Sequence, residues 1–138
     1  MSVDPQLTKA LAATDLFGSL KKRGLERLAS TMSVATHPAG TPITEEGEGA
    51  AAFHIILDGT ATVSVLGETV NTLGPGGYFG EIALIDGKPR TATVTPDSEL
   101  KTAGLTAWQF RPLLDEIDGL AVTLLFVVCQ RLRNARLA

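Results

Sequence analysis

The sequence has 138 residues, of which 44% are hydrophobic, and a formal net charge of −3. This length and apolar content suit one domain with a buried core, and the slight acidity argues against nucleic-acid binding by this chain alone. Cys129 is the only cysteine, which excludes an intrachain disulfide and is consistent with a reducing, cytoplasmic location. The N-terminus lacks the features of a signal peptide, and the apolar run at 120–129 is shorter than the about 20 residues that span a bilayer.

Two helices are expected within residues 4–32. The first runs from Pro5 to Ala13, because Asp4 is a good N-cap and Pro5 suits the first helical position. The second runs from about Leu20 to Met32 and carries its leucines on one face. Both helices are therefore expected to pack with an apolar side against the rest of the domain.

Residues 33–106 carry the pattern of a small β-roll or barrel, since short β-prone runs alternate with Gly, Pro and Asp turns. The dipeptide Asp58-Gly59 predicts a hairpin between two of the runs, and 65–69 predicts a second, very short one. The predicted strands are Ser33–His37, Pro42–Thr44, Phe53–Leu57, Thr60–Leu66, Glu68–Leu73, Arg90–Thr95 and Glu99–Leu105.

The stretch 74–94 has the composition of an anion-binding cradle. Its glycines, Gly76, Gly77 and Gly80 among them, allow tight turns and close approach of a ligand to the backbone. Residues 81–84 can form a helical turn whose first N–H groups favour a phosphate. Arg90 returns at the start of the next strand and can complete the anion site with its planar charged fork.

Glu81 does not fit a simple phosphate site, because a carboxylate repels a phosphate. It fits if it accepts a hydrogen bond from another part of the same ligand, such as a sugar hydroxyl. The structural alternative is a first-turn carboxylate that interacts with the helix dipole, and both roles are compatible.

Two further helices close the chain. The first spans 107–114, with Thr106 as N-cap and Gln109 at the capping-box position, and the second runs from Asp118 to about Ala135. The second helix has an apolar face that comprises Leu120, Leu124, Val127 or Val128, and Leu132. This face is expected to be a switch surface, a seam for a homodimer or partner protein, or a face packed onto the β domain.

The motif at 79–84, Phe-Gly-Glu-Ile-Ala-Leu, followed by Pro-Arg-Thr-Ala-Thr-Val at 89–94, resembles the phosphate-binding cassette of the cyclic-nucleotide-binding domain family. That family includes regulatory subunits of cAMP-dependent kinase, catabolite activator proteins and cyclic-nucleotide-gated channels. The resemblance covers nearly the whole chain. It implies a mainly β fold with flanking helices (α+β): an eight-stranded antiparallel β-roll, or jelly roll, as one domain over 1–138.

The resemblance also implies the roles of the cassette residues. Arg90 would pair with the cyclic phosphate, and Glu81 would accept from the ribose 2′-hydroxyl. Backbone groups of four residues would complete this end of the site: Gly80, Ile82, Ala83 and Ala92. Thr91 can bond either the phosphate or the amino group of a guanine, so it leaves both cAMP and cGMP open.

The purine is expected on apolar strand residues, with the final helix as a lid. By position, the strand residues are Val63, Val70 and Leu73, for which ordinary core packing is the alternative. On the helix, Arg131 could stack on the base as a planar cation, and Asn134 lies near it. The alternative for both is a solvated helix end.

The function implied is a sensor or regulatory module that binds a cyclic nucleotide, cAMP in the first place and cGMP as the alternative. No cofactor or metal is expected, because His37 and His54 are the only histidines and no ligand-spaced motif is present. Catalysis is not expected either. A fragment of a larger transcription factor, kinase or channel, and a domain that has lost its ligand, remain alternatives.

Overall fold

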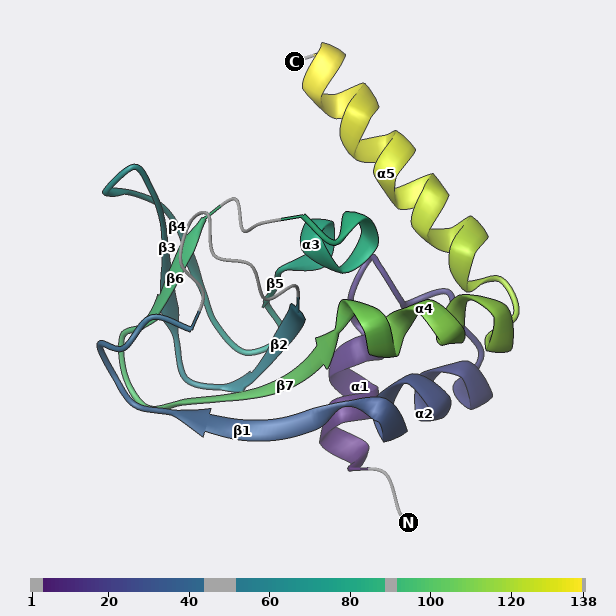
Figure 1. Ribbon diagram of the computed structural model, residues 1–138, viewed down its shortest axis with the longest axis horizontal. Coiled ribbons are helices and arrows are strands. Elements are labelled where there is room, and N and C mark those ends of the chain that lie inside the picture. Colours follow the sequence, from purple (N-terminus) through teal and green to yellow (C-terminus); the bar gives the residue numbers. More distant parts are fainter. Residues whose placement is uncertain (1–3, 44–51, 89–91, 138) are drawn as a thin grey trace.

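The computed structural model describes residues 4–43, 52–88 and 92–137 (Figure 1). Two helices begin the chain, α1 (Pro5–Ala12) and α2 (Lys22–Thr31). Asp4 caps α1 as predicted, since its side chain accepts a hydrogen bond from the Gln6 N–H. α2 begins later than predicted, because the residues before it form turns that bury Leu16 and Phe17.

The β-roll consists of two antiparallel sheets. One sheet has the order β1-β7-β2-β5 and the other the order β4-β3-β6. The fold class is confirmed, but the described residues contain seven strands rather than the eight that the family resemblance implies. The strands are β1 (Ser33–His37), β2 (Ala52–Asp58), β3 (Ala61–Val65), β4 (Glu68–Leu73), β5 (Tyr78–Phe79), β6 (Thr93–Pro96) and β7 (Leu100–Thr106).

One of the seven strands predicted from the sequence, Pro42–Thr44, is not found as a strand in the described residues, whereas β5 was not predicted. Residues 42 and 43 are not in a regular strand, and Thr44 lies outside the described residues. Two backbone hydrogen bonds nevertheless tie this segment to β6, from the Gly40 N–H to the Pro96 carbonyl and from the Ile43 N–H to the Val94 carbonyl. The segment therefore lies along β6 without forming a full ladder.

The hairpin predicted at Asp58-Gly59 is wrong. β2 pairs with β5 and β7, whereas β3 pairs with β4 and β6, so this turn carries the chain from one sheet to the other. A turn dipeptide specifies a local change of direction, but the partner of each strand is decided by contacts far away in the sequence. The second predicted hairpin is confirmed, because β3 and β4 pair across Leu66-Gly67.

β5 is a strand where the sequence indicated only a glycine-rich turn. His54 pairs with Phe79 and Ile55 with Tyr78, which places the residues just before the cassette helix against the middle of β2. This pairing fixes where the helix α3 (Glu81–Asp86) begins.

Two clusters of buried residues form the core. The larger one joins α1, α2 and the C-terminal helices to β2 and β7, with Phe17, Phe53 and Phe110 essentially inaccessible. The smaller one fills the β-roll between the sheets. The helices therefore attach to one end of the roll, and the roll has a core of its own.

The C-terminal helices are α4 (Ala107–Glu116) and α5 (Leu120–Leu137). The predicted capping box of Thr106 and Gln109 starts α4. α5 rises from α4 past α3, and its C-terminal part projects away from the β-roll (Figure 1). No helix in the described part of the chain is both long and apolar enough to cross a membrane.

The apolar face predicted for α5 is partly buried and partly exposed in the structure. Leu120 and Leu124 are buried in the domain, so this part of the predicted face is core, as the packing alternative stated. Leu132, in contrast, is exposed. The exposed apolar residues of α5 are Val122, Leu125, Phe126, Val128 and Leu132.

Candidate functional site

The cassette helix α3 is bounded by two glycines in the left-handed region. Gly80 has φ 84° and Gly87 has φ 70°, and the Gly80 carbonyl accepts from the Leu84 N–H at 3.0 Å. A residue with a Cβ is disfavoured in this region. The N–H groups at positions 81–83 precede the first intrahelical donor, so they point along the start of the helix as anion-binding groups.

The side chains of α3 divide between the core and the surface. Ala83 and Leu84 are buried and hold the helix against the domain, whereas Ile82 is exposed. Glu81 lies in the first turn, with its side chain only 20% exposed. The helix is thus anchored from below while its first turn remains partly accessible.

The chain returns from α3 into β6, which pairs with β3. Pro89, Arg90 and Thr91 lie outside the described residues, so the predicted roles of Arg90 and Thr91 remain predictions. Ala92 follows them and is half-buried. Ser64 pairs with Thr93 and Val63 with Val94, which brings the end of the cassette beside the middle strand of the smaller sheet.

The three residues predicted to contact a purine lie on β3 and β4 in different environments. Val63 and Leu73 are partly buried against the core of the roll. Val70 is 59% exposed and is the extra residue of a bulge, because Val63 pairs with Asn71 and Ser64 with Thr69. The structure therefore groups Val63 with Leu73 and leaves Val70 open to solvent.

Glu81 is contacted from the last helix. Arg131 on α5 donates from Nη1 to Oε1 of Glu81 at 3.0 Å, and its Nη2 lies 3.6 Å from Oδ2 of Asp15, in the turn that follows α1. The Arg131 side chain is 40% exposed. One guanidinium thus joins α5 both to the cassette helix and to the N-terminal segment.

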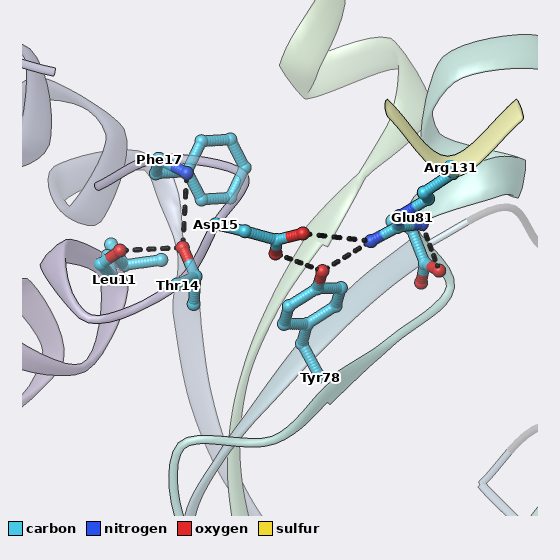
Figure 2. A network of polar contacts seen from close by, with 7 residues as sticks. All are labelled: Leu11, Thr14, Asp15, Phe17, Tyr78, Glu81 and Arg131. Atoms are coloured by element: carbon cyan, nitrogen blue, oxygen red, sulfur yellow. Dashed lines mark hydrogen bonds and ion pairs between the residues drawn. The ribbon is translucent and has the colours of Figure 1, made fainter. Parts of the chain in front are cut away.

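Tyr78 completes this network (Figure 2). Its phenol donates to Oδ1 of Asp15 and accepts from Nη2 of Arg131. The Arg131 guanidinium carbon also lies 5.9 Å from the centroid of the Tyr78 ring. We call the four residues Asp15, Tyr78, Glu81 and Arg131 the α5 network.

The environment of the α5 network shifts two pKa values. Burial raises the pKa of the Tyr78 phenol above its ordinary value, and the hydrogen bond to Asp15 raises it further. Burial by itself lowers the pKa of Arg131, but Tyr78, Glu81 and Asp15 together raise it above its usual range. Tyr78 is therefore a neutral donor and Arg131 a cation at physiological pH.

Asp15 and Tyr78 were not among the residues predicted from the sequence. Tyr78 lies in the cassette stretch, but nothing local marks its side chain as a partner of α5. Asn134 lies one turn beyond the α5 network, is exposed and accepts a hydrogen bond from Gln130 at 3.3 Å. Its predicted contact with a base remains a prediction, as does stacking by Arg131.

An apolar groove separates the cassette helix from the C-terminal helices. Its volume is about 270 Å³, and Leu84 of α3, Phe110 of α4, and Leu124 and Val128 of α5 contribute to its walls. On the side of this groove, α3 and α5 are therefore loosely packed against each other, whereas the α5 network joins the two helices through polar groups.

Comparison with known proteins matches most of the chain to one family of domains. Residues 34–116 match the model of the family described as "Cyclic nucleotide-binding domain". A cAMP-dependent protein kinase regulatory subunit from Emericella nidulans is 35% identical over 112 residues, which cover 80% of this chain and 27% of that protein. The chain therefore spans about a quarter of the length of this curated relative.

Two solved structures are similar over most of the chain. The N-terminal domain of a transcriptional regulator from Streptomyces coelicolor has a TM-score of 0.84 and 28% identity, covering 94% of this chain and 96% of that one. The regulatory domain of Toxoplasma gondii PKA, solved with cAMP, has a TM-score of 0.73 and 32% identity, covering 78% of this chain and 43% of that one.

Proposed function

Because the chain belongs to the cyclic nucleotide-binding domain family, we propose that it binds a 3′,5′-cyclic nucleotide, cAMP in the first place, and that its C-terminal helices respond to the ligand. One observation carries the proposal: Glu81 begins a helix directly after the left-handed Gly80, and its side chain lies in the first turn of that helix, 20% exposed. This arrangement offers anion-binding N–H groups and a hydroxyl-accepting carboxylate within one turn of helix.

The phosphate is proposed to lie at the start of α3. The backbone groups of Gly80, Ile82, Ala83 and Ala92 would surround it, and Arg90 would neutralise its charge. The burial of Ala83 supports this placement, because a small buried residue fixes the helix without blocking its exposed end.

The ribose and base are proposed to extend from there along β3 and β4. Glu81 would accept from the ribose 2′-hydroxyl, and a 2′-deoxy ligand would then leave this carboxylate without that bond. The purine would lie against Val63, Val70 and Leu73, where the exposure of Val70 leaves apolar surface for it. Arg131 and Asn134 on α5 would close over this end.

cAMP is favoured because the curated relative named above is a cAMP-dependent kinase regulatory subunit and because one similar structure was solved with cAMP. A specific residue keeps cGMP as the second candidate, since the Thr91 hydroxyl can bond a guanine amino group. The same kinship supports a regulatory, non-catalytic role. Among the residues that the structure describes, no three His, Cys, Asp or Glu side chains cluster as metal ligands.

α5 is proposed as the element that responds to the ligand. α5 contacts the cassette helix through the α5 network and lines the apolar groove beside it. A change at the first turn of α3 therefore acts directly on α5. Ligand binding would shift the equilibrium between different positions of α5. The size of the shift would depend on how much the contacts of the ligand differ between those positions.

Calorimetric titration with cAMP and cGMP tests the proposal. We expect cAMP to bind and Arg90→Ala to weaken binding by about 100-fold, which corresponds to one lost charge-assisted contact of about 3 kcal/mol, while the domain stays folded. Arg23→Ala, at an exposed position on α2, is the matched control and should bind as the parent does.

Three results would change the assignment. Tighter binding of cGMP would make guanine the base that is recognised. Unchanged affinity of the Arg90→Ala variant would contradict the site. Absence of binding at millimolar nucleotide would mean that the fold has been kept without its ligand.

We further propose that a second copy of this chain packs on the outer face of α5. Val122, Leu125, Cys129 and Leu132 follow the 3-4-3 spacing of a coiled-coil seam, and all four are exposed. Light scattering should show a dimer that Leu132→Glu dissociates, whereas Arg133→Glu, one position outside the seam, should leave the dimer intact. A monomeric parent chain would refute this part of the proposal.

A further inference from the structure

Four residues from four separate segments meet beside the proposed ribose site. Asp15 follows α1, Tyr78 is in β5, Glu81 begins α3 and Arg131 belongs to α5 (Figure 2). Arg131 contacts Glu81 through Oε1 only. Among the described residues, Oε2 of Glu81 takes part in no hydrogen bond or ion pair, so it remains available as an acceptor.

Tyr78 is held in place by the sheet and by the aromatic core beneath its ring. Its backbone pairs with Ile55 in the sheet, and its ring packs on the fully buried Phe53 with the centroids 5.6 Å apart. Phe53 packs in turn edge-on against Phe17, also at 5.6 Å. The phenol is therefore presented to Arg131 by a rigid aromatic column.

Asp15 is held equally well although its side chain is exposed. The preceding Thr14 is buried, donates its hydroxyl to the Leu11 carbonyl at 2.7 Å and accepts from the Phe17 N–H at 3.1 Å. The following Leu16 is buried. Both neighbours thus fix the turn from which the Asp15 carboxylate reaches Tyr78 and Arg131.

The charges of the network explain why Glu81 can tolerate a phosphate nearby. Arg131 lies between two carboxylates, 3.0 Å from Glu81 and 3.6 Å from Asp15. The guanidinium offsets the charge of Glu81, and Tyr78 accepts its Nη2–H, which fixes the plane of the fork. A flexible cation could neutralise Glu81, but it would not hold one carboxylate oxygen in a set direction.

We propose that Tyr78 and Asp15 are positioning residues for ligand recognition: they hold Arg131, which binds Oε1 of Glu81 and directs Oε2 toward the ribose 2′-hydroxyl. This inference rests on the proposed function. It makes selectivity for a ribose over a deoxyribose depend on a turn near the N-terminus and on the last helix. It also couples the ribose contact to the position of α5, since both share one carboxylate.

The test compares the affinities of the full chain for cAMP and 2′-deoxy-cAMP by calorimetry. We expect Tyr78→Phe, Asp15→Asn and Arg131→Gln each to weaken cAMP binding by about 3- to 10-fold, as is usual for coupled hydrogen-bond networks. Binding of 2′-deoxy-cAMP should change less than about 2-fold, because that ligand does not use Oε2 of Glu81. The ratio of the two affinities therefore falls.

Two further measurements separate positioning from general damage. In a Glu81→Gln background, Tyr78→Phe should have little further effect on the affinity ratio, because it acts through Glu81. Arg27→Gln removes the exposed ion pair between Arg27 on α2 and Glu116 on α4, neither of which belongs to the α5 network, and serves as the matched control for Arg131→Gln. It should leave both affinities unchanged.

The outcomes are distinct from those that test cyclic-nucleotide binding itself. Equal losses for the two nucleotides, or no loss for either, would overturn the positioning role while leaving the binding function intact. Tighter cAMP binding by Arg131→Gln would also overturn it, because Arg131 would then compete with the ligand for Glu81. A parent chain that binds neither nucleotide refutes the function and the inference together.

Discussion

Arg131, on the last helix, donates a hydrogen bond to Glu81, on the first turn of the cassette helix, 50 positions earlier in the chain. The residue proposed to recognise the ribose is therefore already bound to the element proposed to respond to it. No intermediate chain of contacts is needed to connect the two, because one carboxylate belongs to both.

Removal of this contact is expected to loosen α5 rather than to unfold the domain. Arg131→Ala should increase hydrogen exchange in the second half of α5, where residues 128–135 other than Arg131 are exposed, while exchange in β2 and β7 stays slow. The free energy of unfolding should fall by less than about 1 kcal/mol, because the Arg131 side chain is 40% exposed. Exchange measured by mass spectrometry provides the check, and an unchanged rate in α5 would contradict the role of the network.

Tyr78 is the only tyrosine, so the near-ultraviolet absorbance of tyrosinate reports its titration alone. Because burial and then the hydrogen bond to Asp15 raise its pKa, tyrosinate should appear in the folded protein only well above the ordinary value of about 10. Asp15→Asn should lower the midpoint. A midpoint at the ordinary value in the parent chain would argue against the buried network.

The sign of the corresponding pH effect on stability follows from linkage. The folded-state pKa of Tyr78 is raised, so the unfolded chain loses this proton first as the pH rises. The stability that Tyr78 contributes is complete below about pH 10 and is lost progressively above it. In the Asp15→Asn variant this alkaline loss should be smaller, which denaturation at several pH values would show.

Gly59 lies where the chain passes between the two sheets, and two effects oppose a side chain there. Its φ is 94°, and a Cβ would stand 2.5 Å from the Glu99 carbonyl oxygen. Gly40 has a similar φ of 83° with no atom within 4 Å, so it isolates the backbone effect. Gly40→Ala should cost about 1–2 kcal/mol of unfolding free energy. Gly59→Ala should cost about 1–3 kcal/mol more, owing to the clash; equal costs in chemical denaturation would mean that the turn relaxes.

Leu66 occupies an unfavourable position at the tip of the β3–β4 hairpin. Its φ is 52°, in the left-handed region that residues other than glycine rarely adopt, and its side chain is 88% exposed. Since Gly67 follows with φ 80°, the turn suits an Asn-Gly sequence. Leu66→Asn should raise the free energy of unfolding by about 0.5–1 kcal/mol. A loss of stability would show that the leucine makes a contact worth more than the strain.

Much of the fold follows from local signals. Asp4 with Pro5, and Thr106 with Gln109, mark helix starts that the structure confirms, because a cap acts within one turn of its own helix. Gly80 likewise adopts the left-handed conformation that the glycine-rich cassette requires. The motif at 79–84 and 89–94 was also sufficient to identify the family, because its two segments lie close together in the sequence.

Local signals failed where partners are distant. The turn at Asp58-Gly59 was correctly placed as a turn, but its strands pair with other strands, and β5 became a strand only because β2 lies beside it. Arg90 and Thr91, which the sequence marks most clearly, lie outside the described residues, so their roles depend on the binding experiments.

The sequence by itself determined the cassette, its bounding glycines and the carboxylate of Glu81, because all of these act over a few neighbouring residues. Only the tertiary structure decided what Glu81 is bound to. Asp15 is separated from Tyr78 by 63 positions and Arg131 from Glu81 by 50. No periodicity or motif links residues at such separations; they meet because the helices at both ends of the chain share one core against β2 and β7.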